Sequence, residues 1–486
     1  MSFLFRGTSR SRNLALFKNA ARPSPRLASR FGHERCASTA AAVERCTILS
    51  SDAISNLDSK NAQRLAKLQL SPGIFSQIQQ QIEAGEENAF YVVDTSAVEE
   101  RYKLWNDYLP EVRPYYAVKC NPDAHLLQSL ARLGAGFDCA SLAEINAVLN
   151  HGVDPSDIIY ANPCKQPSHV AFATSRGVDM MTFDSQDELT KIKKINPNAK
   201  LVLRLYVDDT KAICRLGTKF GAMVHDVPSI LSHAKDLNLD VVGVSFHVGS
   251  GCFSVSAYSD AVVRARKAFD IGQSLGFQLN LLDIGGGFPG TEGGPISFQD
   301  CAMELKTSLA QHFPQSSGAR IISEPGRFFA ASTHTLAVNV IGRKVAPTFD
   351  IPGTGPDASG SAAAAAADKD HSVPNYMYFV NDGLYGSFNC LVYDHPTIQP
   401  VVVTDAASED NLHSASIWGP TCDGMDCIMK DIKMPAMDIG QWICFPSMGA
   451  YTCAAGSDFN GFAPPQKIYF DGSEAVEEKQ EQQFVH

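Results

Sequence analysis

The sequence predicts an α/β protein: a (β/α)8 barrel followed by a C-terminal domain of antiparallel strands. Between Phe90 and Gly326, eight short apolar runs alternate with segments whose apolar residues recur at helical spacing. After Phe328, apolar and polar residues alternate between frequent turns, which is typical of antiparallel strands. Eight strand–helix units close most simply as a barrel of the TIM type, although an open doubly wound sheet is an alternative.

The predicted barrel strands are the eight apolar runs Pro114–Cys120, Gly136–Ala140, Ile158–Pro163, Met180–Asp184, Leu201–Tyr206, Val241–Val248, Leu279–Ile284 and Arg320–Glu324. Helices are expected between them, for example over Ser141–Asn150, Gln186–Ile195 and Ser256–Leu275. Ser185 is a candidate N-cap, and Glu188 three residues later would complete a capping box.

The domain limits follow from the same patterns. We expect residues 90–327 to form the barrel and 328–471 the second domain, to which the preceding segment 41–89, or Thr47–Asp94 in a wider definition, also contributes. An insertion at 347–372, with the run Ala362–Ala367, and an acidic tail at 472–486 are expected to be disordered.

Residues 1–40 differ in composition from the rest of the chain. They contain eight Lys or Arg residues and one acidic residue, with abundant Ser and Ala. Such a leader is typical of a mitochondrial transit peptide, and the alternative is a disordered basic extension that targets nothing. Either way the leader is excluded from the fold. We expect a cytoplasmic protein, with mitochondrial targeting as the alternative.

Composition excludes several classes of function. The formal net charge of -11 over 486 residues argues against a nucleic-acid binder, and no apolar run approaches the roughly 20 residues of a membrane span. Thirteen cysteines occur without CxxC pairs, which indicates reduced thiols inside the cell and no metal site.

Lys119 is the most unusual residue of the predicted barrel. It closes the apolar run Tyr115–Val118, and a lysine there is costly unless it is paired, modified or reactive. Lysine forms Schiff bases, and burial lowers its pKa toward nucleophilic use. The alternative is a strand-end lysine that reaches solvent.

Similar residues follow most of the other strands, at the end of the barrel where loops carry catalysis. They are Asp138 late in strand two, Arg204 in strand five, His247 with Ser250 at the close of strand six, Gly285–Gly287 after strand seven and Glu324–Arg327 after strand eight. Each alone could be a capped turn or a surface ion pair. Together they predict an active site.

These residue types would suit pyridoxal phosphate held on Lys119. Gly285–Gly287, Gly326 and Arg327 could bind the phosphate through backbone N–H groups and a guanidinium. Glu324 could keep the ring nitrogen protonated, which lets the ring withdraw electrons after decarboxylation. The alternatives are a flexible glycine turn and a simple Glu324–Arg327 ion pair.

His247 could lie flat on the cofactor ring, although a histidine at a strand end is more often a packing residue. Asp138 and Glu144 could orient His247 and Lys119.

Nine motifs resemble the eukaryotic ornithine decarboxylase family, in order, over about residues 45–470. They are Tyr116-Ala-Val-Lys-Cys-Asn121, Gly136-Phe-Asp-Cys-Ala-Ser141, Ser245-Phe-His-Val-Gly-Ser250, Asp283-Ile-Gly-Gly-Gly-Phe-Pro289, Ser323-Glu-Pro-Gly-Arg327, Asn381-Asp-Gly-Leu-Tyr-Gly-Ser-Phe-Asn389, Tyr393-Asp-His395, Trp418-Gly-Pro-Thr-Cys-Asp-Gly424 and Gly449-Ala-Tyr451. The resemblance implies a pyridoxal-phosphate enzyme of fold type III that converts L-ornithine to putrescine and CO2, the entry step of polyamine biosynthesis.

The resemblance also assigns roles to individual residues. It implies a Schiff base on Lys119, with His247 stacked on the ring and Glu324 at its nitrogen. The remaining cofactor contacts implied are Asp138, Arg204, Ser250, Gly286, Gly287, Gly326, Arg327 and Tyr451.

The family acts as a head-to-tail homodimer with shared sites. The resemblance therefore implies that Cys422 and Asp423 act in the site of the other subunit. Cys422 would reprotonate the substrate's Cα, while Asp394 and Asp423, beside Tyr393, would bind its distal ammonium.

Other functions remain open at this point. A decarboxylase that prefers lysine or arginine would share the fold, whereas Asp423 would repel the distal carboxylate of diaminopimelate. A non-catalytic protein similar to the antizyme inhibitors is a third alternative. An active enzyme could also bind an antizyme-like regulator near Gln166–Lys194, where Lys191, Lys193 and Lys194 read equally as a solvated helix face.

Overall fold

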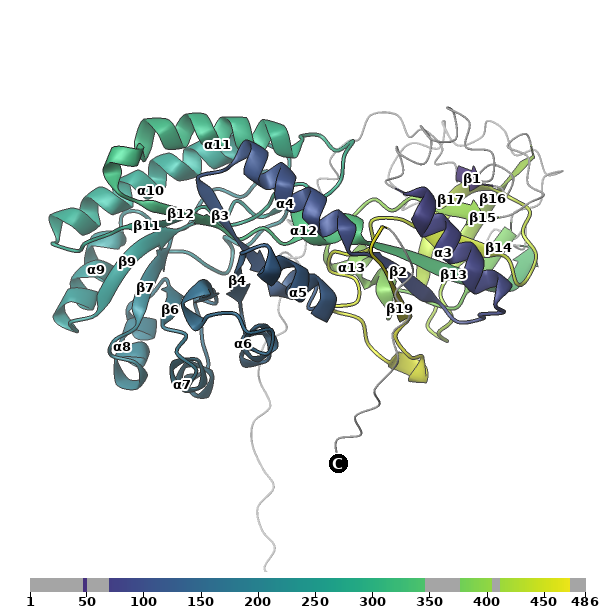
Figure 1. The fold of residues 1–486 in the computed structure, drawn as a ribbon, viewed down its shortest axis with the longest axis horizontal. Coiled ribbons are helices and arrows are strands. Elements are labelled where there is room, and N and C mark those ends of the chain that lie inside the picture. Colours follow the sequence, from purple (N-terminus) through teal and green to yellow (C-terminus); the bar gives the residue numbers. More distant parts are fainter. Residues whose placement is uncertain (1–46, 50–69, 346–375, 404–410, 473–486) are drawn as a thin grey trace, which may run out of the picture. The chain divides into compact units, whose positions relative to one another are not determined.

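The computed structural model describes residues 47–49, 70–345, 376–403 and 411–472. Eight parallel strands close into a barrel (Figure 1). In barrel order they are β11 (Leu281–Asp283), β12 (Arg320–Ser323), β3 (Val112–Ala117), β4 (Gly136–Cys139), β5 (Ile158–Tyr160), β6 (Met180–Phe183), β7 (Lys200–Arg204) and β9 (Asp240–Ser245). The predicted barrel and all eight of its strands are confirmed, and the open-sheet alternative is wrong.

Most predicted strands extend too far at their C-terminal ends. Val118 and Cys120 are buried, but they belong to the 3-10 turn Val118–Cys120 that follows β3. Burial in this protein therefore continues beyond the strands into the loops at the C-terminal end of the barrel. An apolar run in the sequence cannot separate a strand from a buried turn after it.

An outer layer of helices surrounds the barrel (Figure 1). It contains α4 (Ser96–Tyr108), α5 (Ala124–Arg132), α6 (Leu142–Leu149), α7 (Pro167–Ser175), α8 (Gln186–Ile195), α9 (Val227–Asp236), α10 (Ser256–Ser274) and α11 (Phe298–His312). The main apolar core lies between these helices and the strands. A smaller cluster that includes Tyr115, Ile159 and Ile322 fills the barrel interior.

The predicted capping box at α8 is only half formed. The Ser185 side chain accepts a hydrogen bond from the backbone N–H of Glu188, as expected of an N-cap. The Glu188 carboxylate instead pairs with the buried ammonium of Lys165 at 2.8 Å and with Lys191. A buried cation requires a counter-charge, which outweighs a single backbone N–H.

The second domain is a nine-stranded sheet (Figure 1). Its strands are β1 (Thr47–Leu49), β2 (Phe90–Asp94), β13 (His334–Val345), β14 (Tyr376–Val380), β15 (Val401–Val403), β16 (Leu412–Trp418), β17 (Cys427–Pro435), β18 (Trp442–Phe445) and β19 (Gln466–Phe470). The helix α3 (Pro72–Glu83) packs against one face through Ile74, Phe75 and Ile78. Many pairs are antiparallel as predicted, but β1–β15, β14–β16 and β2–β19 are parallel.

Two predicted boundaries need correction. Strand β2 pairs with β13 and β19 in the sheet of the second domain, so the barrel begins after residue 94 rather than at residue 90. The wider definition of the preceding segment, which ends at Asp94, is the one that includes this strand. The stretch expected to open the second domain as strand at Phe328 is helical first, in α12 (Arg327–Ala330) and a 3-10 turn to Thr333. Phe328 and Phe329 are fully buried beside Trp105.

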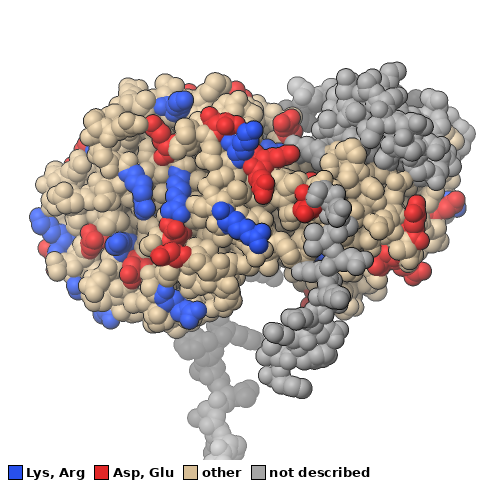
Figure 2. All heavy atoms as spheres, viewed as in Figure 1, with Lys and Arg blue, Asp and Glu red and all other residues tan. Residues whose placement is uncertain are grey.

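The leader at 1–40, the insertion at 347–372 and the tail beyond residue 472 lie outside the described residues. Within the described ranges, no helix has the length and apolar character of a membrane-spanning segment. On the face shown in Figure 2, the described basic side chains lie scattered among acidic ones and form no continuous basic stripe.

Candidate active site

Lys119 lies at the C-terminal end of the barrel and forms an ion pair with Asp138 at the end of β4. The Asp138 side chain is completely buried, whereas the Lys119 side chain is 39% exposed. Lys119 is therefore held by a buried carboxylate on one side and faces open space on the other. This is the position expected of a lysine that holds a bound group.

The expectation that burial lowers the pKa of Lys119 is wrong. Burial alone would lower it, but the neighbouring carboxylates of Asp138 and Glu324 outweigh burial and raise the pKa of Lys119 above its ordinary value. Lys119 is thus an ammonium in the protein as described. It must transfer a proton before its Nζ can act as a nucleophile.

The buried carboxyl groups at this end of the barrel include Asp138, Asp283 and Glu324. Burial raises the pKa of Asp283 to about 6, although the N–H of Gly285 donates to it. Burial also raises the pKa of Glu324 well above its ordinary range, and Asp283 and Asp138 raise it further. One of the closely spaced carboxyl groups therefore carries a proton near neutral pH.

Arg204 at the end of β7 supplies a buried positive charge to this cluster, where it favours the ionised forms of Asp138 and Glu324. Glu144 does not orient Lys119 or His247 through a hydrogen bond. Its carboxylate accepts the N–H of Ala140 at 2.6 Å and so closes the first turn of α6.

His247 lies just beyond β9 and is neutral. Burial, Arg204 and Lys119 hold its pKa well below the ordinary value. Its Nδ1 accepts the N–H of Gly249 at 2.9 Å, so in the neutral ring the proton is on Nε2. A Cβ at Gly286 would lie 3.0 Å from this Nε2 and 2.5 Å from the carbonyl oxygen of Glu324. Glycine at 286 thus lets the His247 ring approach β12.

Arg327 contacts two other members of the predicted phosphate cradle, Ser250 and Tyr451. Its Nη2 donates to the Ser250 hydroxyl at 2.9 Å and to Asp394 at 2.5 Å, and the guanidinium lies 5.3 Å from the ring centre of Tyr451. Burial lowers the pKa of Arg327, but Asp394 more than compensates and raises it.

Two backbone features determine which groups surround this predicted cradle. Ser250 begins β10 (Ser250–Cys252), which pairs with β8 (Ala212–Cys214) and fixes the hydroxyl beside Arg327. Gly285 and Gly287 adopt φ of 63° and 99°, which side-chain-bearing residues disfavour. The turn after β11 therefore brings backbone close to the site without side chains in between.

The residues expected to act in the site of a partner subunit lie in the second domain, outside the barrel. Cys422 and Asp423 lie on the exposed loop between β16 and β17. The Asp423 carboxylate accepts the hydroxyl of Tyr385, which lowers the pKa of Asp423. No hydrogen bond or ion pair among the described residues joins this loop to Lys119 or Arg327. Tyr393, the last residue of α13 (Cys390–Tyr393), is 70% exposed, whereas its neighbour Asp394 is buried and pairs with Arg327.

Sequence reasoning missed two carboxylates. Asp283 belongs to the motif Asp283-Ile-Gly-Gly-Gly-Phe-Pro289. Its position among the buried acids could not be predicted, because it depends on the register of β11 beside β12. Asp426 fixes the loop of Cys422: its carboxylate accepts the N–H of Leu384 at 2.7 Å and the hydroxyl of Thr421 at 2.7 Å. Only its position three residues after Asp423 could have indicated this role.

The buried polar atoms fit pyridoxal phosphate. Asp138 Oδ1 and Glu324 Oε1 are buried without a hydrogen-bond partner, in the two carboxyl groups that raise the pKa of Lys119. A pyridinium N–H would satisfy an acceptor of this kind. The glycine turn, Arg327 and Ser250 provide donors for a phosphate on the adjacent side.

Comparison with known proteins agrees with this geometry. Residues 95–331 match the family described as "Pyridoxal-dependent decarboxylase, pyridoxal binding domain". The chain is 48% identical to ornithine decarboxylase of Rattus norvegicus, over 79% of this chain and 81% of the relative. It is 46% identical to antizyme inhibitor 2 of Xenopus laevis, over 77% and 79%. The crystal structure of the arginine decarboxylase of Paramecium bursaria Chlorella virus superposes with a TM-score of 0.73 at 35% identity, over 81% of this chain and 100% of that one.

Proposed function

The chain belongs to the ornithine decarboxylase family, and on that premise we propose that it is a pyridoxal-phosphate-dependent decarboxylase that converts L-ornithine to putrescine and CO2. The observation that carries this proposal is the pairing of Lys119 with buried Asp138 beside the unsatisfied Glu324 carboxyl. Loss of any of these groups would favour a non-catalytic relative instead. All of them are present.

The proposed cofactor roles follow from the donors and acceptors at the barrel end. When bound, pyridoxal phosphate withdraws into its ring the electron pair left at Cα as CO2 departs. Lys119 would attach the cofactor through Nζ, and Asp138 would take up or return the proton at that atom. Arg327, Ser250, Tyr451 and the turn at Gly285–Gly287 would hold the phosphate.

Glu324 and His247 would set the state of the ring. Glu324 would hydrogen-bond the ring nitrogen and keep it protonated, because a buried carboxylate stabilises a neighbouring cation. His247 is neutral and fixed by Gly249, so it would pack on the ring face without adding positive charge. Glu324 would thereby increase electron withdrawal from Cα, and His247 would hold the ring in place.

The distal end of the substrate would be recognised by carboxylates. Asp394 has one oxygen on Arg327 and one, Oδ2, buried without a partner, which suits an incoming ammonium. Asp423 would supply the second carboxylate and Tyr393 a wall of the pocket. A preference for ornithine over lysine or arginine would depend on the distance between these carboxylates and Lys119.

Cys422 would return a proton to Cα. In this step the bond from Cα to the carboxylate breaks, CO2 leaves, and the Cys422 Sγ proton passes to Cα, after which the thiolate recovers a proton from water. Because Cys422 and Asp423 lie on an exposed loop of the same chain, we propose that they act in the site of a partner subunit. Exposed Met425 and the stacked pair Tyr385–Phe459, at 4.3 Å, give that loop an apolar surface for association.

We propose a cytoplasmic enzyme, which a fluorescent fusion with and without residues 1–40 would test. Binding of an antizyme-like regulator is supported by the similarity to antizyme inhibitor 2. In the segment proposed for it, Lys191 is paired with Glu188 and Lys193 donates to the carbonyl oxygen of Asn238 at 3.3 Å, whereas Arg176 and Lys194 are exposed basic residues.

The direct test is CO2 release by the purified holoenzyme supplied separately with ornithine, lysine, arginine and diaminopimelate. We expect a strong preference for ornithine. A preference for lysine or arginine would contradict the assigned specificity and leave the cofactor site standing. Absence of CO2 from every substrate, despite an absorbance band of lysine-bound cofactor, would contradict the enzymatic function and favour a binding role.

A further inference from the structure

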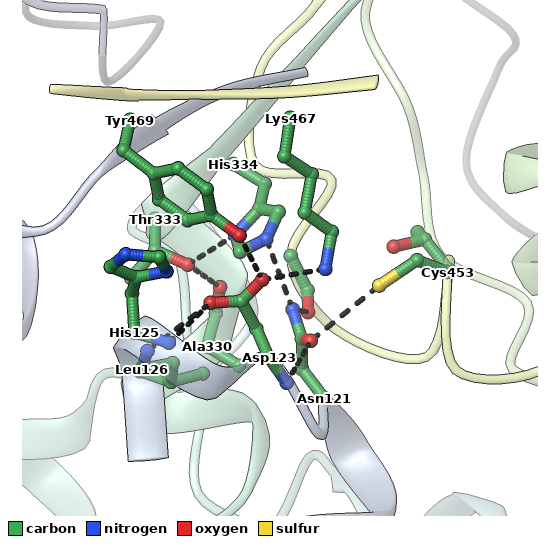
Figure 3. Close-up of polar contacts among 12 residues, drawn as sticks. Asn121, Asp123, His125, Leu126, Ala330, Thr333, His334, Cys453, Lys467 and Tyr469 are labelled. Carbon is green, nitrogen blue, oxygen red and sulfur yellow. Dashed lines mark hydrogen bonds and ion pairs between the residues drawn. The ribbon is translucent and has the colours of Figure 1, made fainter. Parts of the chain in front are cut away.

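Two residues after Lys119, a buried polar network connects the barrel with the second domain (Figure 3). We name it the junction network, and its members are Asn121, Asp123, Thr333, His334, Lys467 and Tyr469. We propose that the junction network positions Lys119 against the groups that hold the cofactor phosphate. This inference rests on the proposed function and adds positioning residues to it.

Asn121 connects the lysine turn to the loop that carries Tyr451. Its side chain is completely buried, and its Nδ2 donates to the carbonyl oxygen of Gly449 at 2.9 Å. The N–H of Tyr451 donates to the carbonyl oxygen of Cys120 at 2.9 Å. Cys120 and Asn121, the two residues after Lys119, therefore each form a hydrogen bond with the loop that carries Tyr451. A Cβ at Gly449 would overlap the Ala330 carbonyl oxygen, so this loop has little room to shift.

A directed chain of hydrogen bonds continues from Asn121 to the helix of Arg327. The Thr333 hydroxyl donates to the Ala330 carbonyl oxygen at 2.7 Å, so it accepts from His334 Nδ1–H at 2.6 Å. His334 Nε2 is then an acceptor for Asn121 Nδ2–H at 3.3 Å. Burial lowers the pKa of His334 to about 4, which keeps the ring neutral as this pattern requires. Ala330 ends α12, which begins at Arg327.

Asp123 anchors the same turn to β19. One carboxylate oxygen caps α5 through the N–H groups of His125 and Leu126, at 3.0 and 3.2 Å. The other accepts from Lys467 Nζ at 2.6 Å and from the Tyr469 hydroxyl at 2.9 Å (Figure 3). Although burial would raise the pKa of Asp123, Lys467 and its other neighbours lower it to about 2. Asp123 is thus a permanent anion bound to both domains.

These contacts fix both ends of the proposed cofactor site relative to each other. Lys119 and its turn are held on one side, and Arg327 and Tyr451 on the other. Displacement of a positioned group by about 1 Å can lower a rate by about 100-fold, so loss of the junction network should affect cofactor binding and turnover beyond its effect on stability.

The test compares Asn121→Ala with Asn196→Ala in the full-length holoenzyme. Asn196 is a matched control because it is also buried, accepts the N–H two residues ahead (Asn198, 3.2 Å; for Asn121 it is Asp123, 3.1 Å), and lies before β7 at the opposite end of the barrel. We expect both variants to melt at lower temperature than the unmodified protein. Only Asn121→Ala should weaken pyridoxal-phosphate affinity by about tenfold and lower kcat, with KM for ornithine little changed.

The inference is contradicted if Asn121→Ala binds the cofactor and turns over normally, or if Asn196→Ala shows equal losses. Should Asn121→Ala not fold, Lys467→Met and Lys467→Arg provide the second comparison. The guanidinium of Lys467→Arg would restore a cation beside Asp123, so cofactor affinity should be largely rescued in Lys467→Arg and not in Lys467→Met; equal affinity in both would contradict the inference. Cofactor titration by absorbance needs no substrate, so a protein that proves inactive on ornithine would refute the proposed function and leave this test intact.

Discussion

The barrel-end cluster and the Cys422 loop differ in almost every physical property. At the barrel end, Lys119 pairs with a fully buried carboxylate, and one oxygen atom each of Asp138, Asp283 and Glu324 is buried without a hydrogen-bond partner. In the loop, Cys422 is exposed and Asp423 is half-buried, and the anchor Asp426 is the buried member. The first region is complete enough to bind a cofactor. The second is the region that we propose to act in the site of a partner subunit.

This difference separates two tasks. Cofactor binding requires desolvated, perturbed groups, which a closed barrel provides through its strand ends. The proposed proton donor lies instead on a loop that Asp426 anchors, and we propose that this loop presents it to a neighbouring molecule. Four substitutions test whether the two regions have these separate tasks.

The largest effect is expected at Lys119. Lys119→Ala should lower kcat by about 10³-fold or more and abolish the absorbance of lysine-bound cofactor, because no other side chain can replace the nucleophile. Lys119→Arg is the matched control: it keeps the ion pair with Asp138 but cannot attach the cofactor. If Lys119→Arg retains activity, the charge of Lys119 matters and its nucleophilicity does not.

Cys422→Ala should lower kcat by about 10²-fold or more while cofactor affinity and thermal stability stay unchanged, because the thiol is exposed and acts only on bound substrate. Cys164→Ala, at another exposed cysteine, should have no effect on turnover. Steady-state kinetics and a cofactor titration measure both. A Cys422→Ala variant that loses its cofactor would remove the distinction between the two regions.

Asp423→Asn should raise KM for ornithine by about tenfold or more, because a charge-assisted hydrogen bond to the distal ammonium is lost. The control is Asp438→Asn, which removes a carboxylate that is 79% exposed and pairs with Arg343. An unchanged KM in Asp423→Asn would place the distal ammonium on Asp394 alone.

The smallest effect concerns stability at acid pH. Because the pKa of Asp123 is about 2 when folded and 3.8 ordinarily, its ionised form stabilises the fold fully above about pH 4. That contribution, about 2 kcal/mol, is lost as pH falls toward 2. Asp123→Asn should therefore be less stable at pH 6, and the free-energy difference from the unmodified protein should vanish near pH 2. A free-energy difference that stays the same at every pH would show that the charge of Asp123 does not contribute to stability.

Most of the barrel could be predicted from the sequence, because apolar strands and helical periods are local patterns. The cluster around Lys119 was predictable for the same reason, since parallel strands end at one face. The parallel pair of β2 and β19 was not, because it joins segments more than 370 residues apart. The raised pKa of Lys119 and the junction network also depend on which charges the fold brings together, as with Lys467 beside Asp123.

The claim that one site uses two chains has a direct test. Purified Lys119→Ala and Cys422→Ala proteins, each inactive alone, are mixed under conditions that exchange subunits, and CO2 release from ornithine is measured. With shared sites, random pairing gives half heterodimers with one intact site each, so activity should return to about a quarter of the unmodified enzyme. Activity that stays at the level of the separate variants would show that Lys119 and Cys422 act within one chain, and would contradict the account.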